Sequence, residues 1–209
     1  MIHGTEADEA PATELAGLRQ TLRDLVRERG HRTLPEPIQL ASGAFSRDFI
    51  DVKQALARGA DLRLACRALL AIAREEAVAF DAVGGLTLGA DALAHGTAIL
   101  SRSAWFVVRK ERKGRGTDKL IEGAVLGHGH RVLLVDDVVT TGGSIQAAYR
   151  SIRETGAHVV LASALVDRGD TASAFFAAAG VPYRPVLTYR DVGIEPIGPP
   201  PGGTTSGRG

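Results

Sequence analysis

Two adjacent carboxylates, Asp136 and Asp137, follow the apolar run 132–135 and give the sequence its clearest chemical signal. Ionised aspartates accept hydrogen bonds but donate none, so the pair suits a ligand that carries hydroxyl groups or positive charge. Neighbouring carboxylates at the end of a buried strand are costly unless something pairs with them. We therefore interpret the pair as part of a binding site rather than as an ordinary turn.

Small polar residues and glycines come two residues after the acid pair, in the order Thr140, Thr141, Gly142, Gly143 and Ser144. Glycines let the backbone approach a ligand closely, and N–H and hydroxyl groups at a helix N-terminus favour an anion. The segment is suited to one phosphate group, and a plain helix-capping turn is the alternative. The sequence has no Walker-type G-x-x-x-x-G-K-[ST] motif, and Gly127 and Gly129 lack the third glycine of a dinucleotide fingerprint.

A basic stretch over residues 109–119 carries six basic and two acidic side chains, with glycines at positions 114 and 116. A charge run of this kind is usually a solvated surface loop. This run begins at the end of an apolar segment in a chain that already has a phosphate-binding pattern. A loop of this composition could close over an anionic ligand and neutralise a leaving pyrophosphate. A nucleic-acid surface is disfavoured, because no aromatic residue interleaves with the basic ones.

The elements that must position these residues alternate between strand and helix from residue 80 onwards. The strands are apolar without a period of two, which is typical of a parallel sheet covered on both faces. In such sheets ligands bind at the carboxyl ends of the strands. The expected strands cover residues 80–83, 105–108, 131–139, 158–166 and 185–189, and the expected helices cover 90–100, 144–154 and 171–179.

The N-terminal part of the chain differs from this pattern. Leucines at three- and four-residue spacing predict a helix over residues 13–29, followed by a short extended excursion and a second helical stretch over 53–79, interrupted at Gly59. We expect residues 1–11 to be disordered and the Pro/Gly-rich residues 194–209 to be a disordered tail. Residues 12–193 are expected to form one domain. Within it, residues 12–52 supply an N-terminal helix and a small extended segment, here called the hood.

The composition limits the remaining classes. With 44% hydrophobic and 23% charged residues the chain is too apolar for a disordered protein. A net charge of +1 disfavours a protein that coats nucleic acid, and the one cysteine, Cys66, excludes an internal disulfide and a multi-cysteine metal site. No apolar run approaches the roughly 18 residues of a membrane span, and the acidic, polar start does not resemble a secretory signal. We predict a cytoplasmic protein with no nucleic-acid or membrane partner and no metal site of its own.

The segment 131–144 resembles the phosphoribosyl diphosphate (PRPP) signature of the type I phosphoribosyltransferases: a hydrophobic strand, two acids, two hydrophobic residues, then Thr and Gly. The resemblance implies that family's fold, an α/β domain with a mostly parallel sheet flanked by helices and a small N-terminal hood. It also implies that the loop holds the ribose 5-phosphate and that the acid pair contacts the ribose 2- and 3-hydroxyls. The implied PRPP contacts here are Asp136, Asp137, Val138, Val139, Thr140, Thr141, Gly142, Gly143 and Ser144.

The basic stretch resembles the catalytic loop of the orotate phosphoribosyltransferase family, usually Arg-Lys-x-x-Lys-x-His-Gly. Arg109, Lys110 and Lys113 match this pattern, which implies that they bind PRPP. Arg115 stands where the family has histidine; it keeps a cationic donor but loses a titratable group. In the family this loop reaches the neighbouring subunit's active site, so the resemblance implies a homodimer that shares the loop 109–119.

Further segments are similar to the same family. Residues 83–90 resemble its pyrophosphate-side loop, residues 42–49 resemble its hood, and Arg168 aligns with its base-binding arginine. Without the resemblance, Arg168 would be read as a surface residue after a strand. The resemblance implies orotate contacts by Thr140 and Arg168. The hood departs from the family at Ala41, Ala44 and Asp48, all on the base side of the site.

The expected activity is transfer of the 5-phosphoribosyl group from PRPP to orotate, which yields orotidine 5'-phosphate and pyrophosphate in pyrimidine synthesis. The implied catalytic residues are Lys110, Lys113, Asp136 and Asp137, and the implied cofactor is Mg²⁺ bound mainly through the PRPP diphosphate. Two alternatives stay open: a phosphoribosyltransferase for another base, and a non-catalytic PRPP-sensing regulator.

Overall fold

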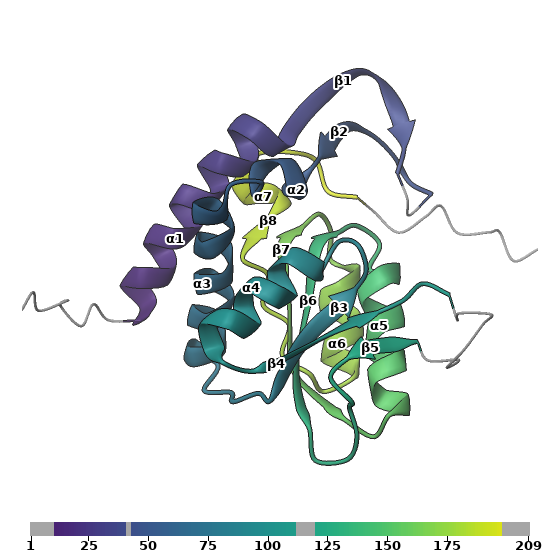
Figure 1. The fold of residues 1–209 in the computed structure, drawn as a ribbon. Coiled ribbons are helices and arrows are strands. Elements are labelled where there is room, and N and C mark those ends of the chain that lie inside the picture. The colour runs from purple at the N-terminus through teal and green to yellow at the C-terminus, as the bar shows by residue number, and fades with distance from the viewer. Residues whose placement is uncertain (1–10, 41–42, 112–119, 198–209) are drawn as a thin grey trace, which may run out of the picture.

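The computed structural model describes residues 11–40, 43–111 and 120–197. A six-stranded sheet has the order β5-β4-β3-β6-β7-β8 (Figure 1). Its neighbouring strands are parallel except for β4 with β5, so the predicted α/β class and mostly parallel sheet are confirmed. The strands are β3 (Ala82–Leu86), β4 (Ala104–Val108), β5 (Ile121–Gly123), β6 (Arg131–Val139), β7 (His158–Asp167) and β8 (Leu187–Thr188).

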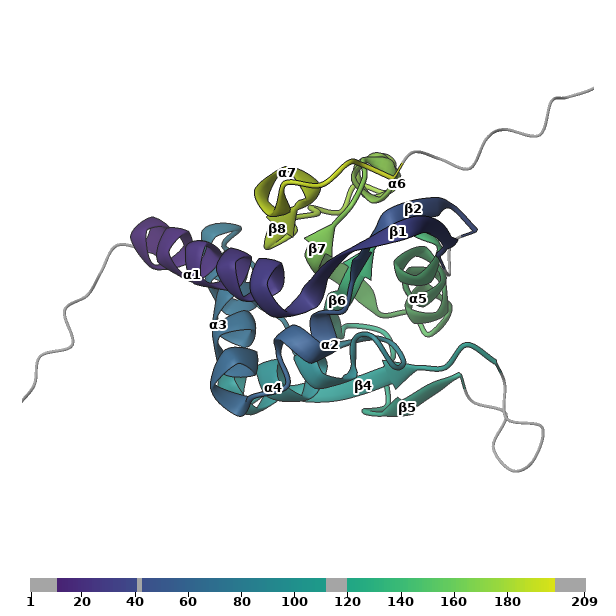
Figure 2. The same ribbon diagram turned by 90° about the horizontal axis from the view of Figure 1, so that it is seen from above.

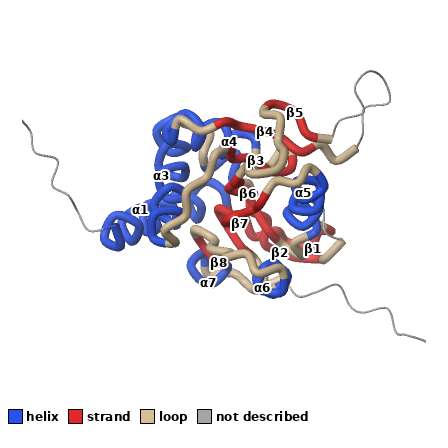
Figure 3. The backbone as a smooth tube through the Cα atoms, turned by 90° about the horizontal axis from the view of Figure 1, so that it is seen from below, coloured by secondary structure: helices blue, strands red, loops and turns tan. Residues whose placement is uncertain are grey.

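Helices cover both faces of this sheet (Figures 2 and 3). On one face α4 (Asp91–Ser101) packs on β3, α3 (Gly59–Glu75) packs on α4, and α1 (Pro11–Leu25) packs on α3. The other face carries α5 (Gly143–Glu154) and α6 (Thr171–Ala178). In β6, Leu133 and Val135 pack in the first layer, while Val132 and Leu134 pack in the second. Because both faces are buried, the strand is continuously apolar up to its acid pair.

The hood is the antiparallel hairpin of β1 (His31–Gln39) and β2 (Phe45–Ile50), which stands above the sheet in Figure 1. Pro35 and Pro37 lie within β1, where the pairing register shifts between Thr33 and Ile38. Proline has no N–H to donate to a ladder, so a shift at this point is expected. The guanidinium of Arg47 bridges the gap by donating to the carbonyls of Leu34 at 3.1 Å and Pro35 at 2.8 Å. Ala41 lies outside the described residues.

The elements that flank the hood differ in detail from the sequence predictions. The helix predicted over residues 13–29 is α1 followed by a π-helical turn, η1 (Val26–Gly30). The stretch predicted over 53–79 is a short helix, α2 (Val52–Ala55), followed by α3, which begins at Gly59 rather than being interrupted there. Asp51 explains the early start of α2, because its side chain accepts a hydrogen bond from the Gln54 N–H and caps the helix.

Two strand predictions also need correction, and one strand was missed. The first strand runs over Ala82–Leu86 instead of the predicted 80–83, and it includes Gly84 and Gly85. A side chain at either glycine would overlap a neighbouring strand, at the Phe106 or the Val135 carbonyl, so the glycines allow close strand packing. The last strand is only Leu187–Thr188, because Thr188 and Asp191 form a capping box that starts the helical turn α7 (Tyr189–Val192). The three-residue β5 was not predicted.

The chain remains attached to the domain slightly beyond the predicted boundary at residue 193. Ile194 packs against the core, Ile197 is buried, and the Ile197 N–H donates to the Arg168 carbonyl. The part of the predicted tail from 194 to 197 is thus ordered against the domain, because its two isoleucines have apolar surface to bury. The disorder predicted for residues 1–10 and 198–209 lies outside the residues that the structure describes. Pro11, which was also predicted to be disordered, begins α1. In the described ranges, no helix has the length and apolar character needed to cross a membrane.

Candidate active site

The acid pair lies near the carboxyl end of β6, on the segment that pairs with β7. Asp136 is 4% exposed, and the Asp137 side chain is 14% exposed. The Asp136 Oδ1 accepts a hydrogen bond from the Asp137 N–H at 3.0 Å, and the Asp137 Oδ1 accepts one from the Val138 N–H at 2.8 Å. The Lys53 Nζ lies 3.1 Å from the Asp137 Oδ2. Two carboxylates and one ammonium group therefore form a compact charged cluster.

Burial and mutual repulsion both act on this pair. Burial, and secondly the neighbouring charge of Asp137, raise the pKa of Asp136 to about 8. One of two carboxylates that share a site commonly holds a proton for this reason. At neutral pH the pair therefore carries less than its full negative charge, and it gains acceptors when a ligand or a higher pH removes that proton.

The phosphate-type loop follows directly and leads into α5. Gly142 has a left-handed φ of +78° and occupies the N-cap position, where it offers no side-chain hydrogen bond to the helix. Gly143 and Ser144 are exposed, and Thr140 and Thr141 are half-buried. The first-turn N–H groups of an α-helix lack intrahelical partners. This end of α5 is therefore open to an anion and has hydroxyl groups beside it.

The two valines between the acids and the loop have different surroundings. Val138 is half-buried beside the site, whereas the Val139 side chain is buried in the core below α5 and α6. The Val139 carbonyl also accepts the Arg168 N–H at 2.8 Å. Any contact of Val139 with a ligand is therefore made by its backbone.

The β3–α4 loop, which resembles a pyrophosphate-side loop in sequence, lies beside the acid pair. A Cβ at Gly89 would overlap the Asp137 Oδ1 and lie 3.2 Å from the Asp136 Oδ1. Its Thr87–Leu88 peptide bond is cis, and the Thr87 hydroxyl donates to the Asp91 Oδ2 at 2.9 Å. The backbone of this loop therefore forms one wall of the candidate site.

Arg168 is not a surface residue. It follows β7, is 1% exposed, and lies beneath the hood. Its Nη1 donates to the Asp48 carbonyl at 3.0 Å and its Nη2 to the Ser46 Oγ at 3.1 Å, while its buried Nε has no partner among the described residues. Burial lowers the pKa of Arg168, and the charge of Asp48 opposes that change. A buried guanidinium whose Nε has no partner is a candidate for binding an acceptor group.

The basic loop leaves the sheet at its edge. Arg109 follows β4, its N–H donates to the Leu120 carbonyl at 2.8 Å, and its Nη1 lies 2.9 Å from the Glu122 Oε1 in β5. The two antiparallel strands thus bring Arg109 and Leu120 side by side at this edge of the sheet, at the right of Figure 2. Lys110 is exposed, and within the described ranges neither Arg109 nor Lys110 contacts the acid pair. Lys113 and Arg115 lie outside the described residues.

Two site residues were missed by the sequence analysis. Gly89 belongs to a segment that was noted only as a whole, although its lack of a side chain is what admits the acid pair. Lys53 lies 84 residues from its partner Asp137, and nothing in its local sequence indicates the contact. Lys53 lies on a helix of only four residues, which is too short for a periodic pattern that could have identified Lys53 as a site residue.

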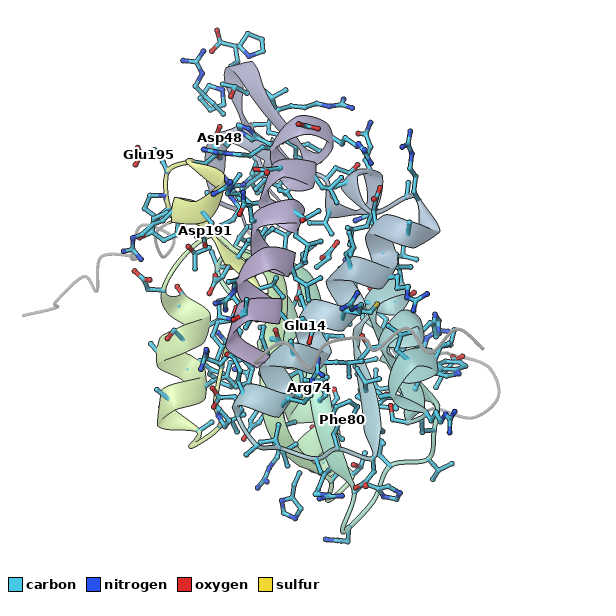
Figure 4. All side chains as sticks on the ribbon, turned by 90° about the vertical axis from the view of Figure 1, so that its left-hand side faces the viewer. Glu14, Asp48, Arg74, Phe80, Asp191 and Glu195 are labelled. Carbon is cyan, nitrogen blue, oxygen red and sulfur yellow. The ribbon has the colours of Figure 1, made fainter. Side chains whose placement is uncertain are left out.

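A hollow of about 450 Å³ opens at the opposite end of the molecule from the hood. Figure 4 shows Glu14, Arg74 and Phe80 gathered there, far from Asp48. The Glu14 carboxylate is engaged by Arg67 and Arg74, each at 2.8 Å. Among the described residues, these ion pairs engage the one carboxylate that lines the hollow, and none of the predicted site residues lines it.

Comparison with known proteins agrees with this geometry. Residues 82–174 match the family described as "Phosphoribosyl transferase domain". The orotate phosphoribosyltransferase of Corynebacterium glutamicum is 39% identical over 187 residues, covering 86% of this chain and 96% of that protein. The Methanothermobacter thermautotrophicus enzyme of the same name is 40% identical over 152 residues, covering 73% of this chain and 82% of that protein.

A solved structure extends the likeness to three dimensions. Mycobacterium tuberculosis H37Rv orotate phosphoribosyltransferase, in complex with PRPP, has a TM-score of 0.66 and 32% identity to this chain, and covers 85% of this chain and 99% of its own. With a relative at 39% identity aligned over nearly its entire length, the chain belongs to the orotate phosphoribosyltransferase family, within the phosphoribosyltransferase domain proteins.

Proposed function

We propose that this protein transfers the 5-phosphoribosyl group of PRPP to a ring nitrogen of orotate, giving orotidine 5'-phosphate and pyrophosphate in pyrimidine (UMP) biosynthesis. The observation that carries the proposal is the juxtaposition of the acid pair, the Gly89 backbone and the uncapped start of α5. In the reaction the ring N–H of orotate loses its proton to water or to the leaving pyrophosphate, and the nitrogen lone pair bonds to ribose C1. The electrons of the broken C1–O bond leave with pyrophosphate.

The PRPP side of the site follows from the charges of the groups. Residues 140–144, with the backbone of Val138 and Val139, surround the 5-phosphate, and Asp136 and Asp137 accept hydrogen bonds from the ribose hydroxyls. Carboxylates near C1 also stabilise the positive charge that develops there, and no covalent nucleophile is needed. The cationic loop supplies Arg109, Lys110, Lys113 and Arg115 to the leaving pyrophosphate.

The base side rests on Arg168 and Thr140. Orotate carries a carboxylate, and an arginine is the side chain best suited to a planar anion. Arg168 has its Nε free, while its other two nitrogens hold the hood at Ser46 and Asp48. Orotate at this position would either use the free Nε or replace part of the hood contact.

Magnesium fits the chemistry of this site as a substrate-bound ion. Among the residues that the structure describes, no three His, Cys, Asp or Glu side chains converge to hold a metal. Mg²⁺ usually keeps several waters and binds through substrate phosphates with one or two carboxylates. When bound it would neutralise charge on the diphosphate, with Asp136 or Asp137 as the protein groups within reach.

A homodimer completes the proposal. Exposed apolar side chains lie on α4, on β4 and just after β5, near the edge from which the basic loop leaves: Ile99, Leu100, Trp105 and Val125. A second copy seated there would cover this surface and receive the loop 109–119 in its active site. Light scattering of the full chain is expected to give twice the monomer mass of 21.9 kDa. The cytoplasmic location stays a prediction from the sequence.

One assay tests the reaction. The purified protein is incubated with PRPP, Mg²⁺ and a panel of free bases, and pyrophosphate release is followed. Release that depends on orotate is the expected result. Release with only another base would replace the proposed acceptor, and PRPP binding without release would indicate a PRPP-sensing regulator.

A further inference from the structure

Lys53 contributes a charge to the acid pair from a distant part of the chain. Its Nζ lies 3.1 Å from the Asp137 Oδ2, whose partner oxygen is already bonded to the Val138 N–H. Both oxygens of Asp137 are therefore fixed, one by backbone and one by an ammonium group. In the part of the chain that the structure describes, Lys53 is the basic side chain in contact with the pair.

The backbone that carries Lys53 is rigidly placed, although its side chain is 61% exposed. Val52 and Ala55 are buried in the core on either side of it. Asp51 caps α2 through Gln54, and its own N–H donates to the Gly30 carbonyl at 2.8 Å. A lysine with a fixed backbone and an exposed side chain can hold a carboxylate in place and can still move when a ligand binds.

The other ionisable groups around the acid pair differ from Lys53 in charge. Asp51 from the α2 N-cap adds a negative charge, and Tyr183, which lies ahead of β8, stays neutral because burial raises its pKa. Burial acts to lower the pKa of Lys53, but the charges of Asp137, Asp51 and Asp136 outweigh it and raise that pKa. The lysine thus remains charged, and its charge in turn opposes protonation of Asp136.

We infer that Lys53 is a positioning residue for the ribose-binding acid pair: its ammonium group holds the carboxylate of Asp137 in place for PRPP. The inference rests on the proposed function of the pair. Because α2 follows directly after β2, the same contact links the base of the hood to the ribose site.

The variant Lys53→Met keeps an unbranched side chain and removes the charge. We expect its KM for PRPP to rise by about fivefold, the equivalent of the roughly 1 kcal/mol typical of a partly exposed ion pair. The kcat and the KM for orotate are expected to stay near their wild-type values. The rise is expected to be larger at pH 6.5 than at pH 8.5, because without Lys53 the pKa of Asp136 moves higher and its acceptor is lost at low pH.

Two further variants separate positioning from a structural effect. Lys53→Arg keeps the charge and is expected to recover most of the PRPP affinity. Arg32→Met removes an exposed cation that donates to the Gln54 Oε1 of α2 at 2.7 Å, and it is expected to leave both the PRPP KM and its pH profile unchanged. Urea unfolding of all three variants checks that differences in KM do not follow differences in stability.

Calorimetric titration of the full chain with PRPP alone distinguishes the inference from the proposed reaction. If the wild type binds PRPP but transfers it to no base, the reaction is rejected, and the Lys53 variants still test the positioning of the acid pair. The inference is overturned if Lys53→Met binds PRPP with wild-type affinity and pH profile, if Arg32→Met has the same effect, or if the wild type does not bind PRPP.

Discussion

Replacing Gly142 by alanine tests the phosphate loop through the one residue whose backbone requires glycine there. Its φ of +78° costs an L-residue about 1–2 kcal/mol. The added Cβ would lie 3.0 Å from the Gln146 Nε2, which is the end of a flexible side chain and can move away. The loss is therefore mainly backbone strain, and in a chain of this size it lowers Tm by about 2–8 °C.

Gly180→Ala is the matched control. Gly180 follows α6 with a φ of +67°, and a Cβ there would meet nothing within 4 Å. It carries the same strain without bordering the site, so its Tm is expected to fall by a similar amount. In Gly142→Ala, relief of strain rotates the peptide groups at the start of α5. Loss of one hydrogen bond to a charged phosphate, about 1.5–3 kcal/mol, raises the KM for PRPP about tenfold or more.

The measurements are calorimetric Tm values and the KM for PRPP at saturating orotate for the wild type and both variants. Equal PRPP KM values in the two variants, at equal losses in Tm, would refute the assignment of the 5-phosphate to this loop. A Tm of Gly142→Ala equal to that of the wild type would instead refute the strain argument.

Three other substitutions probe the remaining parts of the site. Lys110→Ala is expected to lower kcat by about 100-fold, with an unchanged Tm because the side chain is exposed; near-normal turnover would remove it from the mechanism. Asp136→Asn is expected to abolish PRPP binding and to flatten the pH dependence of Tm. Between pH 3.8 and about 8 the folded wild type holds a proton on Asp136 that the unfolded chain loses, so its stability falls as pH rises through that range. An identical pH slope in the variant would contradict this. Arg168→Met is expected to raise the KM for orotate by a much larger factor than the KM for PRPP, and equal factors would count against a base-side role.

Much of the fold could be predicted because local patterns determine it. The strand 131–139 was predicted with the bounds that β6 has, since the apolar run 132–135 and the two valines after the acid pair all favour a strand, and the small polar residues and glycines from Thr140 end it. The order of acids, hydroxyl residues and glycines then placed a helix start at the carboxyl end of the strand. These features depend on neighbours in the sequence, and the structure keeps them together.

The contacts between distant segments could not be predicted in the same way. Lys53 meets Asp137 only because the chain passes from the hood through α2 above the end of β6. Arg168 is buried because the hairpin β1–β2 covers it, which no pattern around residue 168 indicates. Ile197 was assigned to a tail because its neighbours are proline and glycine, although its own side chain finds a place in the core.

These long-range contacts share one consequence for the site. The hood is held to the sheet by Arg168 at Ser46 and Asp48, and its base is held by Lys53 at Asp137. Both tethers end on groups that the substrates are proposed to use, Arg168 on the base side and Asp137 on the ribose side. A ligand that accepts from Arg168 or donates to Asp137 thus binds a side chain that also holds the hood. The side chains that fix the hood are therefore the same two that the substrates are proposed to contact, one on the base side and one on the ribose side.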